Sequence, residues 1–130
     1  VPKGPIVSMT DKSGATETFS SELEKVPFPI AVLVNHGTAS AAEIVSGAIQ
    51  DTGSGKLFGT KTFGKGVVQN VFMLSQKTAV KLTIAKYYTP SGRSIDKVGI
   101  EPDETVEAIG AAGTNQLEAA EAYLKTVISQ

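Results

Sequence analysis

The chain has 130 residues, of which 41% are hydrophobic and 19% charged, and its formal net charge at pH 7 is −1. This composition is typical of one globular domain with a hydrophobic core and excludes a disordered chain. There is no basic stripe, so we expect no nucleic acid as a partner. The absence of cysteine excludes disulfides and thiolate metal sites, and no apolar run is long enough for a membrane span. We expect neither a metal nor a cofactor.

The first part of the chain is predicted to form a β-hairpin and then a buried strand. Residues 6–10 alternate weakly between apolar and polar, and residues 11–14 (DKSG) have turn chemistry. Residues 15–19 are the expected returning strand. After a connector, residues 29–34 (PIAVLV) are continuously apolar, which predicts a strand buried on both faces in a parallel or mixed sheet.

A helix is predicted over residues 40–50. Its apolar side chains recur with helical spacing, and the predicted buried stripe consists of Ile44, Val45, Ala48 and Ile49. A strand followed at once by a helix is the usual local unit of an α/β fold.

The second half of the chain is predicted to be mostly β, with a terminal helix. The expected elements are a strand at 56–59, a loop at 60–66, strands at 67–74 and 78–88 with a hairpin turn at Gln76 and Lys77, a turn at 89–92, a loop at 99–103 and a linker at 108–113. In the last helix, Asn115 is the predicted cap and Glu118 completes a capping box. Its predicted apolar face consists of Leu117, Ala120, Leu124, Val127 and Ile128. The order of elements predicts a single α/β or mixed α+β domain over residues 1–130.

Ser40 is the first candidate for chemistry. It stands where the predicted helix begins, beyond the carboxyl end of a strand, which is where α/β folds bind ligands. The free amides of a first helical turn would stabilise an oxyanion, and the Ala41 N–H is the natural donor. The alternative is structural, because Ser40 and Glu43 also match a capping box. His36 is a weaker candidate base, since Asn35 cannot stabilise its charge as a carboxylate would.

A glycine-bearing loop, residues 59–66 (GTKTFGKG), nearly matches a phosphate-binding loop. Gly66 replaces the Ser or Thr that would hold magnesium, and a strand rather than a helix is predicted after it. Nucleotide is therefore not expected as a ligand. Lys65, between two glycines, is either a general base or a solvated loop residue. Gln69 either orients the reacting groups or is an exposed strand residue.

Four stretches together resemble the carboxyl-terminal processing (tail-specific) serine peptidases. They are NHGTASAAEIVSGAIQD, GTKTFGKGVVQ, LTIAKYYTPSGRSI and GIEPD, and NQLEAAEAYL is similar to the closing helix of that family. The resemblance implies a crotonase/ClpP-like peptidase core with a mixed sheet, a β-hairpin and a C-terminal helix. It also implies a serine endopeptidase with a Ser–Lys dyad that cleaves proteins near their C-termini.

The resemblance also implies roles for particular residues. Ser40 maps onto the nucleophile and Lys65 onto the general base, with Gln69 assisting. The Ala41 amide would be one oxyanion donor, and Asp51 would have an auxiliary role.

The family's upstream core segment, with a second oxyanion amide, and its PDZ module have no counterpart in this sequence. Hydrolysis by the 130-residue chain alone is therefore expected to be absent or weak, and self-association through an exposed sheet edge is expected. The implied partners are protein or peptide substrates, and the implied location is the bacterial cell envelope. The alternatives are a non-catalytic binding or assembly module that keeps the fold and, third, nucleotide binding at the glycine loop.

Overall fold

A computed structural model describes residues 1–75, 77–110 and 113–129. The strands are β1 (Gly4–Asp11), β2 (Thr16–Ser21), β3 (Ala31–Val34), β4 (Lys56–Gly59), β5 (Val67–Ser75), β6 (Thr78–Tyr88) and β7 (Glu104–Thr105), and the helices are α1 (Ala41–Asp51) and α2 (Thr114–Ile128). The predicted α/β class is confirmed. The predicted hairpin turn at Gln76 and part of the predicted linker, residues 111–112, lie outside the described residues.

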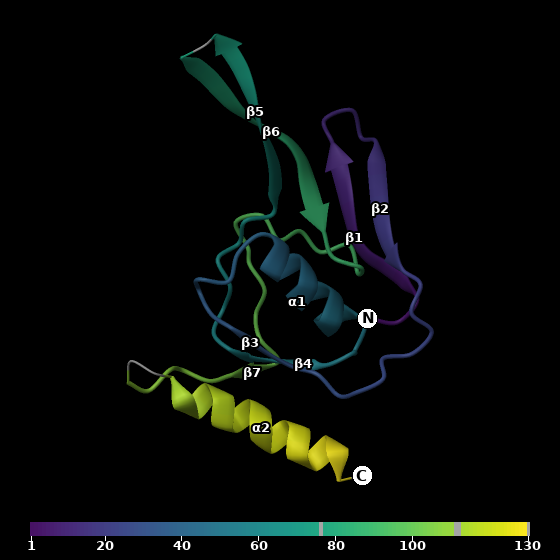
Figure 1. Cartoon of the computed structure of the whole chain (residues 1–130), viewed down its shortest axis with the longest axis vertical. Coiled ribbons are helices and arrows are strands. Elements are labelled where there is room, and N and C mark those ends of the chain that lie inside the picture. The colour runs from purple at the N-terminus through teal and green to yellow at the C-terminus, as the bar shows by residue number, and fades with distance from the viewer. Residues whose placement is uncertain (76, 111–112, 130) are drawn as a thin grey trace.

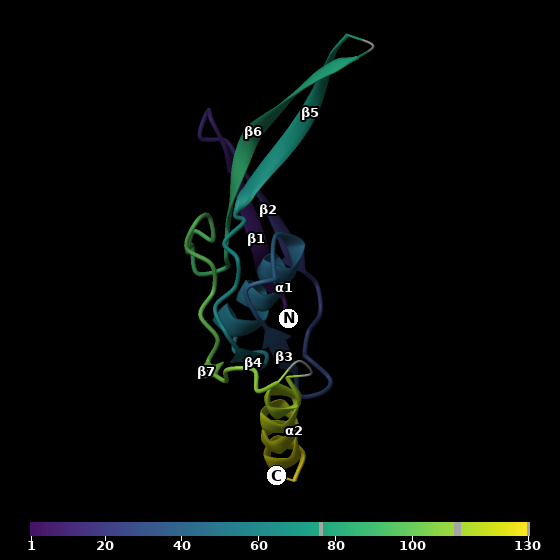
Figure 2. The ribbon, with the colours of Figure 1, turned by 90° about the vertical axis from the view of Figure 1, so that its left-hand side faces the viewer.

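The strands form two separate sheets instead of the one mixed sheet that was expected. One is antiparallel, with the order β2-β1-β6-β5, and the other is parallel, with the order β3-β4-β7. Figure 1 shows α1 on one face of the parallel sheet and α2 on the other. The turned view in Figure 2 shows the β5–β6 hairpin extending away from this three-layered body.

The hydrophobic core is centred on β4, the middle strand of the parallel sheet. Leu57 and Phe58 are both 0% exposed, and because successive side chains of a strand point to opposite faces, they pack into different layers. Leu57 belongs to the cluster that also contains Val34, Ile49, Ile95 and Ile100. The Phe58 ring lies 5.4 Å from the ring of Tyr123 on α2. Burial of each such side chain contributes about 2 kcal/mol.

Two of the predicted burial patterns are wrong. β3 is not buried on both faces, because Leu33 is 46% exposed, and it is an edge strand of its sheet. On α1 the predicted stripe is right for Ala48 and Ile49, which are buried, and wrong for Val45, which is exposed. The buried face of α1 instead includes Glu43, Ser46 and Gly47. Hydropathy alone did not indicate this, because two of these three residues are polar and the third has no side chain.

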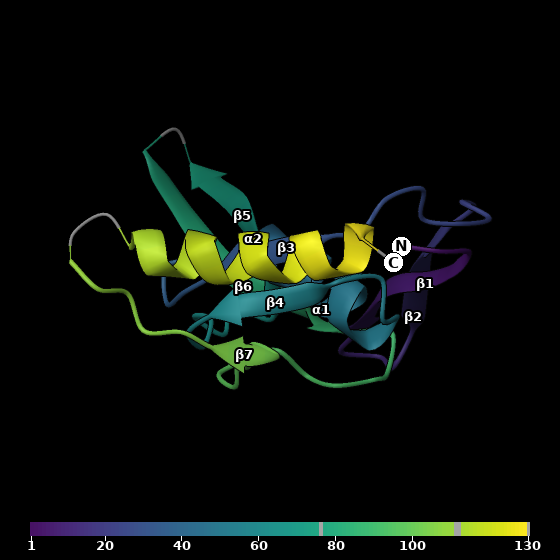
Figure 3. The same cartoon turned by 90° about the horizontal axis from the view of Figure 1, so that it is seen from below.

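The predicted cap and face of α2 also need correction. The N-cap is Gly113, and Asn115 lies inside the first turn, where its amide bonds back to Glu107 and Ile109. Leu117, Val127 and Ile128 are exposed. The helix of 15 residues is about 22 Å long, whereas a four-residue strand spans about 13 Å. Figure 3 shows α2 running along β3 and β4, which are too short to cover it fully.

No helix among the described residues is both long and apolar enough to cross a membrane.

The predicted turn at residues 89–92 is present, with the Gly92 N–H donating to the Thr89 carbonyl at 2.8 Å. Strand β7, which has only two residues, was not predicted from the sequence.

Candidate active site

Ser40 occupies a strained turn between β3 and α1. Its backbone angles are φ 57° and ψ −120°, a region that non-glycine residues rarely adopt and that costs about 1–3 kcal/mol. The turn before it is closed by a hydrogen bond from the Thr38 N–H to the Asn35 carbonyl at 2.8 Å. Such strain in a serine at a strand-to-helix turn is the geometry in which nucleophilic serines are presented in α/β enzymes.

The Ala41 N–H lies at the first position of α1. In the described part of the chain, no hydrogen bond takes up this N–H, whereas the Ala42 and Glu43 N–H groups bond to Ala39 and Ser40 carbonyls. A free N–H at a helix N-terminus, reinforced by the helix dipole, can donate a hydrogen bond to an oxygen on which negative charge develops. The arrangement is therefore suited to an oxyanion beside Ser40.

The loop that carries Lys65 is fixed by close contact with a later segment. The Lys97 N–H donates to the Gly64 carbonyl at 2.8 Å, and the Tyr87 N–H donates to the Gly66 carbonyl at 2.8 Å. A Cβ on Gly66 would lie only 2.7 Å from the Cα of Asp96, which no relaxed structure tolerates. Glycine at this position thus allows the two backbones to touch.

The carboxylate of Glu43 joins this loop to the serine turn. The side chain is 0% exposed, and Oε1 accepts from the Thr62 hydroxyl at 2.5 Å and the Gly64 N–H at 2.7 Å. Oε2 accepts from the Lys65 N–H at 2.8 Å and from the Ser40 N–H at 3.0 Å. From the sequence, Glu43 was expected only as a capping-box residue. That pattern was the one available signal, and it identified a single one of the four donors.

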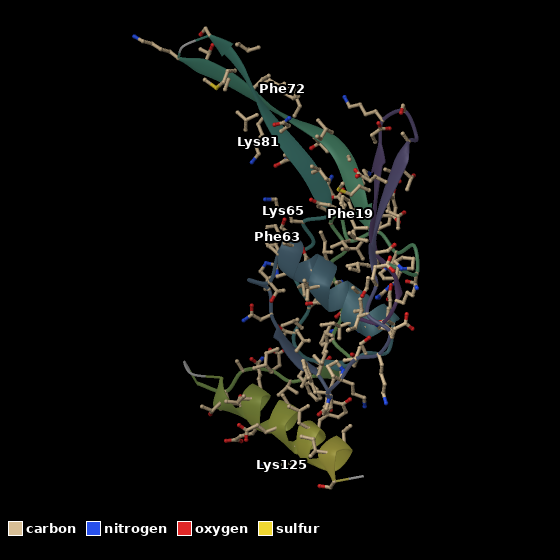
Figure 4. The ribbon with its side chains drawn as sticks, turned by 45° about the vertical axis from the view of Figure 1, so that its right-hand side comes forward. Phe19, Phe63, Lys65, Phe72, Lys81 and Lys125 are labelled. Atoms are coloured by element: carbon tan, nitrogen blue, oxygen red, sulfur yellow. The ribbon has the colours of Figure 1, made fainter. Side chains whose placement is uncertain are left out.

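Ser40, Lys65 and Gln69 line one small pocket of about 210 Å³. Its other lining residues are Val67, Val68, Lys81 and Tyr87. The structure therefore brings together three of the predicted site residues, from the α1 turn, the glycine loop and β5. Figure 4 shows Lys65 near one end of α1, with Lys81 on the hairpin strand beside it.

The pocket is open to solvent. Lys65 and Gln69 are both exposed, and the Gln69 amide donates to the Thr83 hydroxyl at 3.4 Å. The described contacts include no hydrogen bond between the Ser40 hydroxyl and the Lys65 amine. Lys81 is a second lysine at the pocket, and no pattern in the sequence indicated it.

His36 lies outside this pocket. It is exposed, and its ring packs at a tilt of 47° against the ring of Phe63, with centroids 5.4 Å apart.

The glycine loop leads directly into strand β5, so its amides do not open a helix as a phosphate-binding loop requires. Across residues 1–75, 77–110 and 113–129, no three His, Asp or Glu side chains gather as a metal site would need.

Asp51 lies at the other end of α1 and does not line the pocket. Its carboxylate accepts from the Ser91 N–H at 2.9 Å and the Ser91 hydroxyl at 2.6 Å, and it pairs with Arg93. Burial alone would raise the pKa of Asp51, but hydrogen bonds from Ser91 and Thr89 and the Arg93 charge outweigh it and lower the pKa below its usual value. The auxiliary catalytic role of Asp51 stays a prediction.

Known proteins with similar sequences were found over most of the chain. A sequence model described as "Peptidase family S41" matches residues 1–106. The carboxyl-terminal-processing protease of Synechocystis is 46% identical over 108 residues, which is 82% of this chain and 25% of that protein. The chloroplastic C-terminal processing peptidase of Tetradesmus obliquus is 41% identical over 105 residues, 79% of this chain and 23% of that protein.

Two solved structures have a fold similar to that of this chain. A photosystem II D1 C-terminal processing protease superposes with a TM-score of 0.75 at 39% identity, over 82% of this chain and 28% of that one. A lipoprotein from Streptococcus agalactiae superposes with a TM-score of 0.76 at 25% identity, over 97% of this chain and 46% of that one. The chain spans about a quarter of the length of the curated relatives it matches.

Proposed function

The chain belongs to peptidase family S41, and from this premise we propose that it is the C-terminal portion of a serine peptidase catalytic domain with Ser40 as nucleophile and Lys65 as general base. The single observation that supports this most strongly is that both side chains line one pocket although they lie 25 positions apart in sequence. The unoccupied Ala41 N–H at the same helix terminus adds an oxyanion donor.

In the proposed mechanism, the uncharged Lys65 amine takes the Ser40 hydroxyl proton as Oγ attacks a peptide carbonyl carbon. The Ala41 N–H stabilises the resulting oxyanion. The carbon–nitrogen bond then breaks, and the Lys65 ammonium returns its proton to the leaving amine. Lys65 next deprotonates a water molecule that attacks the acyl-enzyme ester. The carbon–Oγ bond then breaks, and the Lys65 ammonium gives its proton to Oγ, which releases the second product and restores the Ser40 hydroxyl and the neutral amine.

The exposure of Lys65 in the open pocket has a direct consequence for this mechanism. A substrate chain seated over the pocket would exclude water from the amine and the hydroxyl while the reaction takes place. Gln69, held by Thr83 at the pocket's edge, would orient either the amine or the substrate. We propose proteins cut near their C-termini as the substrates, in keeping with the relatives described above.

The proposed reaction also needs a second oxyanion donor that the described residues do not supply. The chain spans about a quarter of the length of its curated relatives, and the Ala41 N–H next to Ser40 is the one oxyanion donor assigned among the described residues. Tetrahedral oxyanions in serine peptidases are held by two donors. We therefore expect the 130-residue chain alone to hydrolyse peptides weakly or not at all, and strong hydrolysis by the purified chain would contradict this part of the proposal.

The test is covalent labelling of the full-length protein with a fluorophosphonate, together with a peptide-cleavage assay. Ser40→Ala and Lys65→Ala should each abolish both signals, because one removes the nucleophile and the other its base. Lys61→Ala is the matched control: Lys61 lies in the same loop but pairs with Glu101 at 2.8 Å on the surface. Retained activity in both Ser40→Ala and Lys65→Ala would overturn the dyad.

A second candidate is a non-catalytic binding module that keeps the peptidase fold. The observation that favours it is the absence, among the described contacts, of a Ser40–Lys65 hydrogen bond. It predicts that the full-length protein binds peptides but neither labels nor cleaves. A labelled Ser40 would exclude it.

A further inference from the structure

We propose that Glu43 is a positioning residue that couples the Ser40 turn to the Lys65 loop, an inference that rests on the proposed dyad. The same carboxylate oxygen, Oε2, accepts the backbone N–H of both residues, at 3.0 Å and 2.8 Å. Two nitrogens bound to one oxygen at these distances are at most about 6 Å apart. The backbones of nucleophile and base therefore cannot shift independently while the carboxylate is in place.

The surroundings of Glu43 are those expected of a residue that positions the backbone. Its side chain is 0% exposed, and all four of its contacts are donors, so it acts as an acceptor-only carboxylate. Among the described residues, no Lys or Arg pairs with it, and its charge is balanced by N–H groups, one hydroxyl and the positive end of α1. Burying a charge is costly unless every acceptor is used, as here.

The Glu43 carboxylate also accounts for two features of the site, the positive φ of Ser40 and the fixed backbone of the exposed Lys65. Ser40 keeps its positive φ with its N–H directed onto Oε2. The Lys65 side chain is exposed, but its backbone N–H is bound to the same Oε2 atom. The side chain that carries the amine therefore starts from a fixed point of the backbone at the pocket. The other oxygen, Oε1, holds the Lys65 loop at Thr62 and Gly64.

Glu43→Gln is the sharpest test because it keeps the shape and replaces one acceptor oxygen with a donor NH2. Whichever way the amide turns, two of the four donors then face another donor. In the full-length protein we expect kcat to fall about 100-fold with KM changed less than about twofold, because small displacements of reacting groups reduce rates by this factor. Asp103→Asn is the control: Asp103 also accepts a backbone N–H, from Leu57 at 2.8 Å, but away from the pocket.

A second measurement needs no activity. Amide hydrogen exchange of the unmodified chain should be at least about tenfold slower at Ser40 and Lys65 than at Lys61, whose N–H no described hydrogen bond takes up. In Glu43→Gln, protection should fall at Ser40 and Lys65 together, while the Ile49 amide inside α1 keeps its protection. The exchange measurement stays informative if the variant is too unstable for kinetics. Exchange in the unmodified chain already shows whether the Glu43 carboxylate holds the two amides.

The outcomes separate the two proposals. Slow exchange at both amides, lost together in Glu43→Gln along with kcat, supports the coupling. Fast exchange at either amide in the unmodified chain overturns it whatever the dyad does. Protection lost without a change in kcat overturns the positioning role and leaves Glu43 structural. Activity retained in Ser40→Ala and Lys65→Ala removes the dyad and this role with it, while exchange still reports whether the carboxylate holds the two segments.

Discussion

The two ends of α1 use the same chemistry for different purposes. At its start, Glu43 accepts four hydrogen bonds from the serine turn and the glycine loop, and at its end Asp51 accepts hydrogen bonds from the turn that follows β6. The two carboxylates are eight residues, or about 12 Å, apart along the helix. Only the segments held by Glu43 border the pocket. The comparison supports the proposal that Glu43 acts on the candidate site through the backbones that it fixes, whereas Asp51 fixes a turn that does not line the pocket.

The largest expected difference in stability between the two ends of α1 is between two glycine-to-alanine substitutions. Gly66→Ala at the pocket end should lower the free energy of unfolding by about 3 kcal/mol, because its Cβ would press on the backbone of Asp96. Gly53→Ala at the far end has a φ of +63° but open space, and should cost about 1 kcal/mol. Denaturant unfolding of the chain measures both. Equal losses would show that the pocket end is no more tightly packed than the far end.

Threonine offers a second matched pair. The Thr62 hydroxyl donates to Glu43 and accepts from the Ile100 N–H at 2.7 Å, so Thr62→Val should cost about 2 kcal/mol by leaving buried groups unpaired. The Thr52 hydroxyl donates to the Ala48 carbonyl, which also accepts the Thr52 N–H. Thr52→Val should therefore cost less than about 1 kcal/mol. The same unfolding titration compares them, and the reverse order would break the contrast.

Asp51→Asn should have a smaller effect, a loss of about 1.5 kcal/mol in the free energy of unfolding. The amide keeps one acceptor oxygen for Ser91 but loses the charge that pairs with Arg93. The readout is the shift in thermal or denaturant midpoint. A variant as stable as the parent chain would mean that the turn after β6 is held without Asp51.

The smallest expected effect is a change in pH dependence. The pKa of Asp51 is lowered in the folded chain, so its contribution to stability is complete above the unfolded-state value of about 4 and is lost as pH falls through the lower folded value. Below pH 4 the parent chain should therefore lose stability more steeply than Asp51→Asn. Unfolding midpoints between about pH 2 and pH 6 measure the slopes, and parallel curves would contradict the assignment.

The sequence predicted most elements because their signals are local. The β4 segment, the two long β runs and α1 were all expected close to their observed bounds, from apolar runs and helical spacing. Ser40 and Lys65 were expected as a pair through the family resemblance, and the structure brings both to one pocket. Their catalytic roles are still proposals, because no local pattern or static contact measures reactivity.

The errors came from features that depend on distant neighbours. Leu33 is exposed on the edge strand of its sheet, and Asn115 lies inside α2 with its amide bonded back to Glu107 and Ile109. Strand β7 exists only because β4 offers it a parallel partner. None of these partners is encoded in the few residues around each position.

By itself, the sequence therefore determined the α/β class, the order of the elements and the family, because periodicity and motif spacing are properties of neighbouring residues. Only the tertiary structure decided what Glu43 does. Its partners in the glycine loop lie 19 to 22 positions away, and a hydrogen bond between such residues exists only when the chain has folded. A carboxylate that looks like a helix cap in the sequence binds both segments after folding, through an Oε2 atom that accepts from the serine turn and the lysine loop and an Oε1 atom that accepts from the loop alone.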